Sequence, residues 1–247
     1  MNLILFERRE VGDAVTVRVD DTRARHIREV LKSTPGQAIL IGLIDGPRGL
    51  GTVISVDDSA VTLACDFEEA PPPLPAVDLL LALPRPKVMK RLWAQVAALG
   101  VGRVILVNAA RVERQYFDSH VLEATCYRPL LIEGLQQARD TRLPVVSVHR
   151  RLKVLVEDEL GEMAPGTARL VADPHARDSV GAALSRSGRE RCLLAVGPEG
   201  GWSEFERELL AAHGFLGVSM RDRTLRSDTA CIALLTLAHE ALAARTF

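Results

Sequence analysis

A glycine-rich loop near residue 200 has the residue types needed to hold a ligand. Its sequence, Gly-Pro-Glu-Gly-Gly at 197–201, follows the apolar run 192–196 and precedes Ser203 and Glu206, which are spaced as a helix capping box. Glycines let the backbone approach a ligand closely, and a helix start offers free amide hydrogens. The loop therefore predicts a ligand site, although glycines alone would also suit a tight strand-to-helix turn. It matches neither the G-x-G-x-x-G nor the Walker pattern, so neither a Rossmann dinucleotide site nor a P-loop is predicted.

A second polar segment, 220–230, combines positive charge with two candidate helix caps. Its three arginines form a local cationic patch: Arg221, Arg223 and Arg226. Ser227 or Asp228 can cap the helix that follows, which is their simplest structural role. A fixed cation can also stabilise a developing anion, and a carboxylate can accept a proton. The segment is therefore a candidate part of an active site.

The composition argues against several function classes. The 247 residues carry a formal net charge of -1, and 4% of them are aromatic, so we expect neither bulk electrostatic coating of nucleic acid nor a stack of aromatic base readers. The cysteines and histidines lack metal-ligand spacing, and no metal site is predicted. Apolar runs are too short for a membrane span or a signal peptide. We therefore expect a cytoplasmic protein that does not contact a membrane.

A proline-rich break separates two regions with different patterns. Residues 71–76 predict a stiff linker, because proline cannot sit inside a helix or a central strand. Residues 1–70 predict a small β-barrel, with strands near 15–19, 38–43, 51–56 and 61–65 and one helical segment near 22–31. Residues 77–247 alternate helical patterns with apolar runs near 77–83, 104–107, 145–148, 170–172, 192–196 and 217–220. This alternation predicts an α/β fold with a mainly parallel sheet covered on both faces.

The helices of the second region have recognisable boundaries. Apolar residues from Met89 to Leu99 fall on one helical face, and Gly100 follows as a stop. Another helix is expected to begin after Ser203 and to end before Gly214. The last helix is expected over about 228–244.

The two loops together resemble one specific family. The order Gly-Pro-Glu-Gly-Gly after a strand, then Leu-Arg-Ser-Asp-Thr-Ala (225–230) opening the final helix, resembles the RsmE family of ribosomal RNA (uridine-N3) methyltransferases in the SPOUT superfamily. Residues 134–144 resemble that family's Q-x-x-R-x-x-x-P stretch, and taken alone they would be a solvated helix end. Residues 25–37 resemble its small RNA-binding barrel. The similarity runs along almost the whole chain.

The resemblance implies a fold and an activity that spacing does not show. The C-terminal part would be a knotted α/β domain with a deep trefoil knot, an exception to the rule against knotted chains, and the N-terminal part a PUA-like barrel. The knot would bind S-adenosylmethionine, and S-adenosylhomocysteine would be the product. The enzyme would be a homodimer acting on 16S ribosomal RNA in the assembled small subunit, without a metal.

The resemblance also assigns residues to the site. The cofactor-binding positions would be Gly197, Pro198, Glu199, Gly200, Gly201, Met220, Arg221, Leu225, Arg226, Ser227 and Thr229. The catalytic candidates are Arg226, for stabilising the uridine anion, and Asp228 or Glu199, for accepting the N3 proton. Clusters of arginine, rather than the resemblance alone, give the RNA-binding candidates Arg23, Arg25, Arg28, Arg111, Arg114, Arg139 and Arg142. Of these, Arg139 and Arg142 also match family positions expected near RNA, and any single one of the seven could equally be a solvated surface side chain.

Departures from the family pattern keep two alternatives open. Arg221 and Asp222 stand where the family usually has Gly-Pro, and Asp228 replaces a usual Glu. One alternative is a methyltransferase of the same fold acting on another RNA, such as a ribose hydroxyl of transfer RNA. The other is a catalytically degenerate RNA-binding or ribosome-assembly protein.

Overall fold

The computed structural model describes residues 3–12, 15–220 and 225–244, which form two compact units. The first unit comprises Met1–Leu74 together with Ile132–Leu143, and the second comprises Pro75–Leu131 together with Pro144–Phe247. The first unit thus includes a short segment from far along the chain. The predicted limits 1–70, 71–76 and 77–247 stay a prediction.

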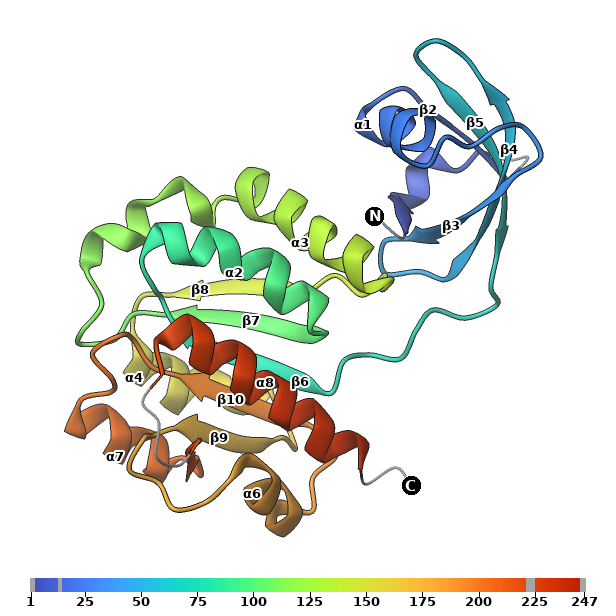
Figure 1. The fold of residues 1–247 in the computed structure, drawn as a ribbon. Coiled ribbons are helices and arrows are strands. Elements are labelled where there is room, and N and C mark those ends of the chain that lie inside the picture. Colours follow the sequence, from blue (N-terminus) through green and yellow to red (C-terminus); the bar gives the residue numbers. More distant parts are fainter. Residues whose placement is uncertain (1–2, 13–14, 221–224, 245–247) are drawn as a thin grey trace. The chain divides into compact units, whose positions relative to one another are not determined.

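The sheet of the first unit is five-stranded and curls around its own core (Figure 1). The strand order is β1 (Ile4–Phe6), β3 (Ala38–Leu43), β4 (Arg48–Val56), β5 (Val61–Phe67) and β2 (Thr16–Val19). Alternate residues of β4 are buried and exposed, as expected for a sheet with one face in a core. The four predicted strands are confirmed. Strand β1, which pairs in parallel with β3, was not predicted because three residues are too few for a periodic signal.

Short helical segments complete the first unit. The predicted helix near 22–31 is confirmed as α1 (Thr22–Arg25) continued by η2 (His26–Val30), and η1 (Arg8–Glu10) follows β1. Asp21 begins α1, because its side chain accepts a hydrogen bond from the Arg23 amide at 2.8 Å.

Arg23 is a structural centre of the first unit. Its guanidinium donates to Glu10 at 2.5 Å, to Asp21 at 2.7 Å and to the Leu5 carbonyl at 2.9 Å, and its side chain is 19% exposed. The hydrogen bond from Arg23 is the main cause that lowers the pKa of Glu10, against the opposing effect of burial. Burial acts to lower the pKa of Arg23 itself, but the bonds to Glu10 and Asp21 outweigh it and raise that pKa. The arginine therefore ties β1, η1 and α1 together.

The second unit contains the predicted parallel sheet. Its six strands lie in the order β11 (Leu216–Val218), β9 (Ala168–Ala172), β10 (Cys192–Val196), β6 (Val77–Ala82), β7 (Val101–Val107) and β8 (Val145–His149). All neighbouring pairs are parallel. Every residue of β6 and β10 is buried, as expected for central strands covered on both faces. The predicted α/β fold is confirmed, and the knot implied by the resemblance stays a prediction.

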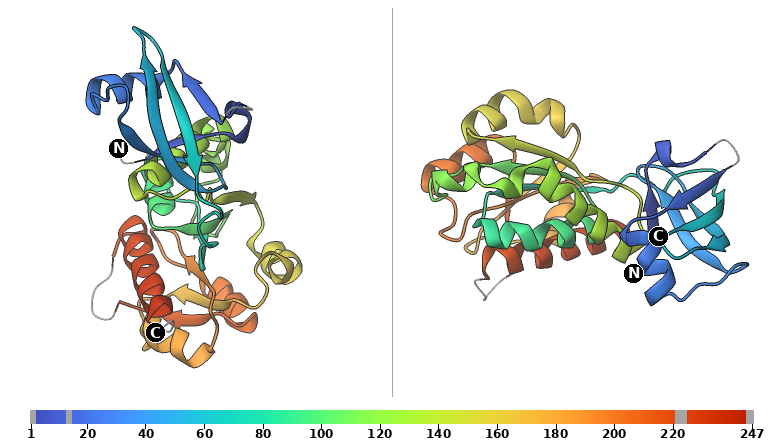
Figure 2. Two further views of the ribbon diagram at one scale, coloured as in Figure 1. Left: turned by 90° about the vertical axis from the view of Figure 1, so that its right-hand side faces the viewer. Right: turned by 90° about the horizontal axis from the view of Figure 1, so that it is seen from above.

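Helices cover both faces of this sheet (Figure 2). On one face α2 (Pro86–Ala98), α6 (Val180–Ser187) and α8 (Ser227–Ala243) pack together. On the other face lie α7 (Glu204–Ala212) and the helical segment formed by α4 (Leu152–Val154), η5 (Leu155–Glu159) and α5 (Leu160–Met163). The chain also forms η3 (Arg114–Asp118), η4 (His120–Leu122) and α3 (Ala124–Ala138). Within the described ranges, no helix is both long and apolar enough to cross a membrane.

The predicted helix boundaries are confirmed. Buried Met89, Leu92, Trp93 and Val96 mark one face of α2, and Gly100 follows with a φ of 74°. Ser203 and Glu206 form both hydrogen bonds of the capping box at the start of α7.

The Arg23 cluster predicts an effect on stability. Arg23→Gln should lower the free energy of unfolding at pH 7 by about 2 kcal/mol, because it leaves partly buried Glu10 and Asp21 without their cation. The pKa of Glu10 lies below its ordinary 4.5 in the folded protein, so its contribution is complete above pH 4.5. The difference from the wild type should therefore diminish as the pH falls below 4.5 through that lowered value.

The control is Arg25→Gln, which removes the same charge from an exposed side chain of the same helix. Urea unfolding of both variants between pH 3 and pH 7 measures the effect. Equal stabilities of the two variants would contradict the structural role of Arg23.

Candidate functional site

Parallel strand pairing brings three loops to one edge of the second sheet. Strand β10 pairs with β6 on one side and with β9 on the other, so the carboxyl ends of all three strands lie together. The chain runs outward from β6 to β7 and β8, whereas β9 and β11 lie beyond β10, so the strand order changes direction between β6 and β10. Ligands of open α/β sheets bind at such switch points.

The glycine loop after β10 is closely packed. A Cβ atom on Gly197 would lie 3.0 Å from Nε1 and 3.1 Å from Cδ1 of the buried Trp202 ring, so the backbone at 197 approaches the indole more closely than a side chain would allow. Gly201 has a φ of 72°, which other residues adopt only with strain. The loop needs glycine at these two positions for different reasons.

Two side chains hold the glycine loop from outside. Arg111 donates a hydrogen bond to the Gly200 carbonyl. The buried Glu206 carboxylate accepts from the amides of Ser203 and Ala110, each at 2.7 Å. The loop after β10 is therefore joined to the loop after β7, and the helix start beside it is fixed.

A first cavity of about 270 Å³ opens beside this loop. The segment between β9 and α6 contributes Asp173, Pro174 and His175, and the start of α8 contributes Leu225, Ser227 and Ala230. Nε1 of Trp202 is a buried donor without a partner among the described residues, and Trp202 belongs to the wall. The cavity thus offers a carboxylate and loop backbone to a ligand.

A second cavity of about 590 Å³ adjoins the first, because Glu199 and Leu225 line both. Its other charged residues lie at or just before the starts of α2 and α8, and they are Arg85, Lys87, Arg91, Arg226 and Asp228. Two ion pairs cross it: Arg85 to Glu199 at 3.4 Å, and Arg91 to Asp228 at 3.2 Å. The first cavity is therefore bordered by a space that is rich in cations.

The two carboxylates have different local roles. Asp228 lies in the first turn of α8 and accepts from the Thr229 amide at 2.9 Å, so it satisfies one free amide of the helix start. Arg226 is the N-terminal boundary residue of α8 and makes no side-chain capping bond. Glu199 lies in the glycine loop, where its ion pair is with Arg85.

The structure brings most of the expected cofactor residues together. The first cavity is lined by seven of them: Gly197, Pro198, Glu199, Gly200, Gly201, Leu225 and Ser227. The three catalytic candidates, Arg226, Asp228 and Glu199, all line the second cavity. Met220 is 38% exposed and, like exposed Thr229, lines neither cavity. Arg221 and Asp222 lie outside the described residues.

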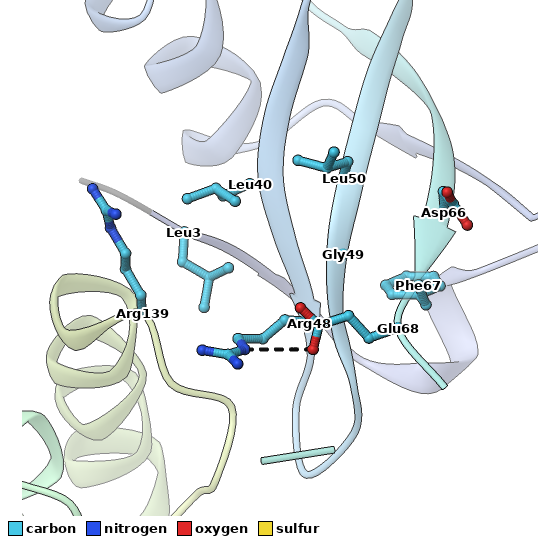
Figure 3. Close-up of a pocket in the computed structure, with 9 residues that line it drawn as sticks. All are labelled: Leu3, Leu40, Arg48, Gly49, Leu50, Asp66, Phe67, Glu68 and Arg139. Carbon is cyan, nitrogen blue, oxygen red and sulfur yellow. Dashed lines mark ion pairs between the residues drawn. The ribbon is translucent and has the colours of Figure 1, made fainter. Parts of the chain in front are cut away.

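The expected RNA-binding arginines of the first unit are in different surroundings. Arg23 is paired with two carboxylates, Arg28 donates to the Asp58 carbonyl, and Arg142 donates to the Pro72 carbonyl at 2.7 Å. Arg25 is exposed. Arg139 has a φ of 59° and lines a cavity of about 530 Å³. Figure 3 shows its side chain together with the Arg48–Glu68 ion pair, which lines the same cavity.

The two expected RNA-binding arginines of the second unit lie near the glycine loop. Arg111 lines the first cavity. Arg114 lines a separate cavity of about 350 Å³, together with Arg150 and exposed Phe205.

Sequence reasoning missed the residues contributed by the neighbouring strands. Arg85, Lys87 and Arg91 follow β6, and Asp173 and His175 follow β9. A charged segment directly after a predicted central strand was the available signal. It was not decisive, because the sequence does not tell that β6 and β9 both lie beside β10.

Comparisons with known proteins agree with this geometry. An RNA methyltransferase domain family matches residues 70–239. The chain is 32% identical to the ribosomal RNA small subunit methyltransferase E of Treponema pallidum, over 97% of this chain and 92% of that protein. It is 25% identical to the ribosomal RNA small subunit methyltransferase E 1 of Borreliella burgdorferi, over 94% and 95%.

A solved structure shows the same fold. The ribosomal RNA small subunit methyltransferase E of Neisseria gonorrhoeae, crystallised with S-adenosyl methionine, superposes with a TM-score of 0.76. The superposition covers 97% of each chain at 20% identity.

The bonds of Glu206 predict an effect on stability. Glu206→Ala should lower the free energy of unfolding by about 2 kcal/mol, because two partly buried amides lose a charged acceptor. Glu204→Ala, an exposed residue in the same first helical turn, should cost less than about 0.5 kcal/mol. Thermal unfolding measures both, and a larger loss in Glu204→Ala would disprove the assignment.

Proposed function

The chain belongs to the family of RNA methyltransferases that includes the small-subunit ribosomal RNA methyltransferases E, and we propose that it methylates N3 of a uridine in 16S ribosomal RNA with S-adenosylmethionine. The observation that carries this proposal is the first cavity, which the Gly197–Gly201 loop and the start of α8 line together. These are the two segments that carry the family resemblance. These segments meet beside a cation-rich space, which supports a site for the methyl donor next to a site for the RNA that accepts the methyl group.

The residues of the first cavity suit the cofactor. The adenosylmethionine has amino, carboxylate, hydroxyl and adenine groups, which require both donors and acceptors. The wall provides loop backbone and the Asp173 carboxylate. We therefore place the cofactor against Gly197, Pro198, Glu199, Gly200, Gly201, Leu225 and Ser227.

The second cavity has the groups needed for the acceptor. The cofactor supplies an electrophilic methyl group, which N3 of uridine takes while the N3 proton leaves. Arg226 would stabilise negative charge on the uridine O2 or O4, since a fixed cation lowers the free energy of a developing anion. Asp228 or Glu199 would accept the proton, because both carboxylates line this cavity. The remaining acceleration would come from holding donor and acceptor in line.

The assembly of the enzyme and its RNA contacts form part of the same proposal. We place the protein in the cytoplasm as a homodimer that acts on the assembled small ribosomal subunit. Exposed Arg25, Arg111, Arg114 and Arg139 are available to phosphates, whereas Arg23 already neutralises two carboxylates.

The glycine loop predicts a loss of cofactor binding. Gly201→Ala forces a side chain into a left-handed backbone conformation and should weaken S-adenosylhomocysteine binding at least about tenfold by displacing the loop. Gly188→Ala is the matched control, because Gly188 has a similar φ of 65°, ends α6 and has open space around its Cβ position.

Both variants should lose about 1 kcal/mol of stability, and only Gly201→Ala should lose affinity. Isothermal titration calorimetry with S-adenosylhomocysteine makes the measurement. Unchanged affinity in Gly201→Ala would remove the loop from the cofactor site.

The carboxylates of the second cavity predict a loss of turnover. Asp228→Asn should lower kcat for methylation of small ribosomal subunits about 100-fold, if Asp228 takes the proton, with S-adenosylhomocysteine affinity unchanged. Glu199→Gln is measured in parallel, and the variant with the larger loss identifies the acceptor.

The recipient RNA tests the acceptor atom itself. An RNA already methylated at N3 of the target uridine should accept no further methyl group. Continued methylation would favour a different RNA atom, such as a ribose hydroxyl, and full activity in both carboxylate variants would exclude either acid as the proton acceptor.

A further inference from the structure

The second cavity carries more positive charge than the transfer reaction itself needs. Among the described residues its charged lining consists of Arg85, Lys87, Arg91, Arg226, Glu199 and Asp228, so four cations face two carboxylates. One cation near O2 or O4 of the uridine is enough to stabilise the anion. The three cations that belong to the β6–α2 segment have no role in the proposed chemistry.

These three cations lie on one side of the start of α2. Arg85 directly precedes the helix, and Lys87 and Arg91 are four residues apart, so they share a helical face. The opposite face of α2 is buried through Met89, Leu92 and Trp93. Packing of that apolar face therefore directs the cationic face toward the cavity.

Among the described residues, each of the two ion pairs in the cavity joins one arginine to one carboxylate, and both pairs are at least partly exposed. The side chains of Arg85 and Glu199 are 66% and 46% exposed, and those of Arg91 and Asp228 are 61% and 24% exposed. Each pair joins one guanidinium nitrogen to one carboxylate oxygen. Exposed ion pairs of this kind contribute little to stability, so an incoming anion can replace the carboxylate at small cost.

A phosphodiester of RNA fits this arrangement. Arginine binds phosphate through two parallel N–H donors, and each guanidinium here uses one nitrogen in its recorded ion pair. A ribonucleotide whose base lies beside the first cavity has its phosphates within the same small region, since base and phosphate are joined through one ribose. The net positive charge of the described cavity residues attracts the single negative charge of such a phosphate.

We propose that Arg85 and Arg91 bind a backbone phosphate next to the target uridine, and that this phosphate replaces Glu199 and Asp228 in the two ion pairs. The inference rests on the proposed function. In the free enzyme each candidate proton acceptor is engaged by an arginine. Binding of the RNA strand transfers the arginines to the phosphate and leaves the carboxylates free to face the uridine N3. The two arginines are thus positioning residues, because their transfer to the RNA phosphate frees the carboxylate that accepts the N3 proton.

The test compares Arg91→Gln and Arg85→Gln with Lys90→Gln. Lys90 is an exposed cation on α2 that does not line the cavity, so its variant matches the change in charge. The substrate is the small ribosomal subunit that lacks the methyl group. Each arginine variant should raise KM for subunits about tenfold and leave kcat within about twofold, because the phosphate contact is lost while the carboxylates stay available.

A second readout measures RNA binding without catalysis. The slope of log affinity against log salt concentration should become shallower in each arginine variant, by less than about one unit because the two arginines share one phosphate. Lys90→Gln should leave KM and the slope near wild-type values. The affinity for S-adenosylhomocysteine should stay unchanged in all three variants, which also shows that they are folded.

Two outcomes would overturn the inference. A fall in kcat with unchanged KM would mean that Arg91 only orients Asp228, and identical behaviour of the arginine variants and Lys90→Gln would mean that the cavity does not bind phosphate. Failure of the proposed function is distinguishable, because the wild type would then not methylate subunits at all.

Discussion

The parallel pairing of β10 with β6 and β9 is the constraint on which the site depends. It places the loops after three strands at one edge of the sheet, although these strands are far apart in the sequence. The glycine loop, the acidic segment after β9 and the cationic start of α2 meet only for this reason. Helix α8 then closes the arrangement, since its first residues line both cavities.

The loop after β10 is held in place by contacts with its neighbours. Gly197 permits contact with the Trp202 ring. Glu206 accepts hydrogen bonds from the Ala110 amide after β7 and from the Ser203 amide after β10, and so joins the two segments. Such contacts reduce the conformational entropy that the loop would otherwise lose when a ligand binds. The same bonds that stabilise the fold therefore shape the candidate cofactor site.

Arginine has different roles in the two units, and burial explains the difference. Arg23 is mostly buried and bonded to two carboxylates and a carbonyl, so its charge stabilises the first unit. Arg85 and Arg91 form single, exposed ion pairs, which a phosphate can replace. The residue type alone therefore did not reveal which arginines are free to bind RNA, and the expectation for Arg23 treated it as equivalent to exposed Arg25.

Local signals in the sequence determined the elements, the fold class and the two loops of the candidate cofactor site. Alternating burial, the Ser203–Glu206 capping box and Gly100 are short-range features, which one sequence shows directly. The family motifs likewise lie within single loops. The order of strands, the short strand β1 and the inclusion of Ile132–Leu143 in the first unit depend on contacts between distant residues. Only the tertiary structure therefore placed Arg85 and Arg91 beside Glu199 and Asp228, because the pairing of β6 with β10 leaves no pattern in either strand alone.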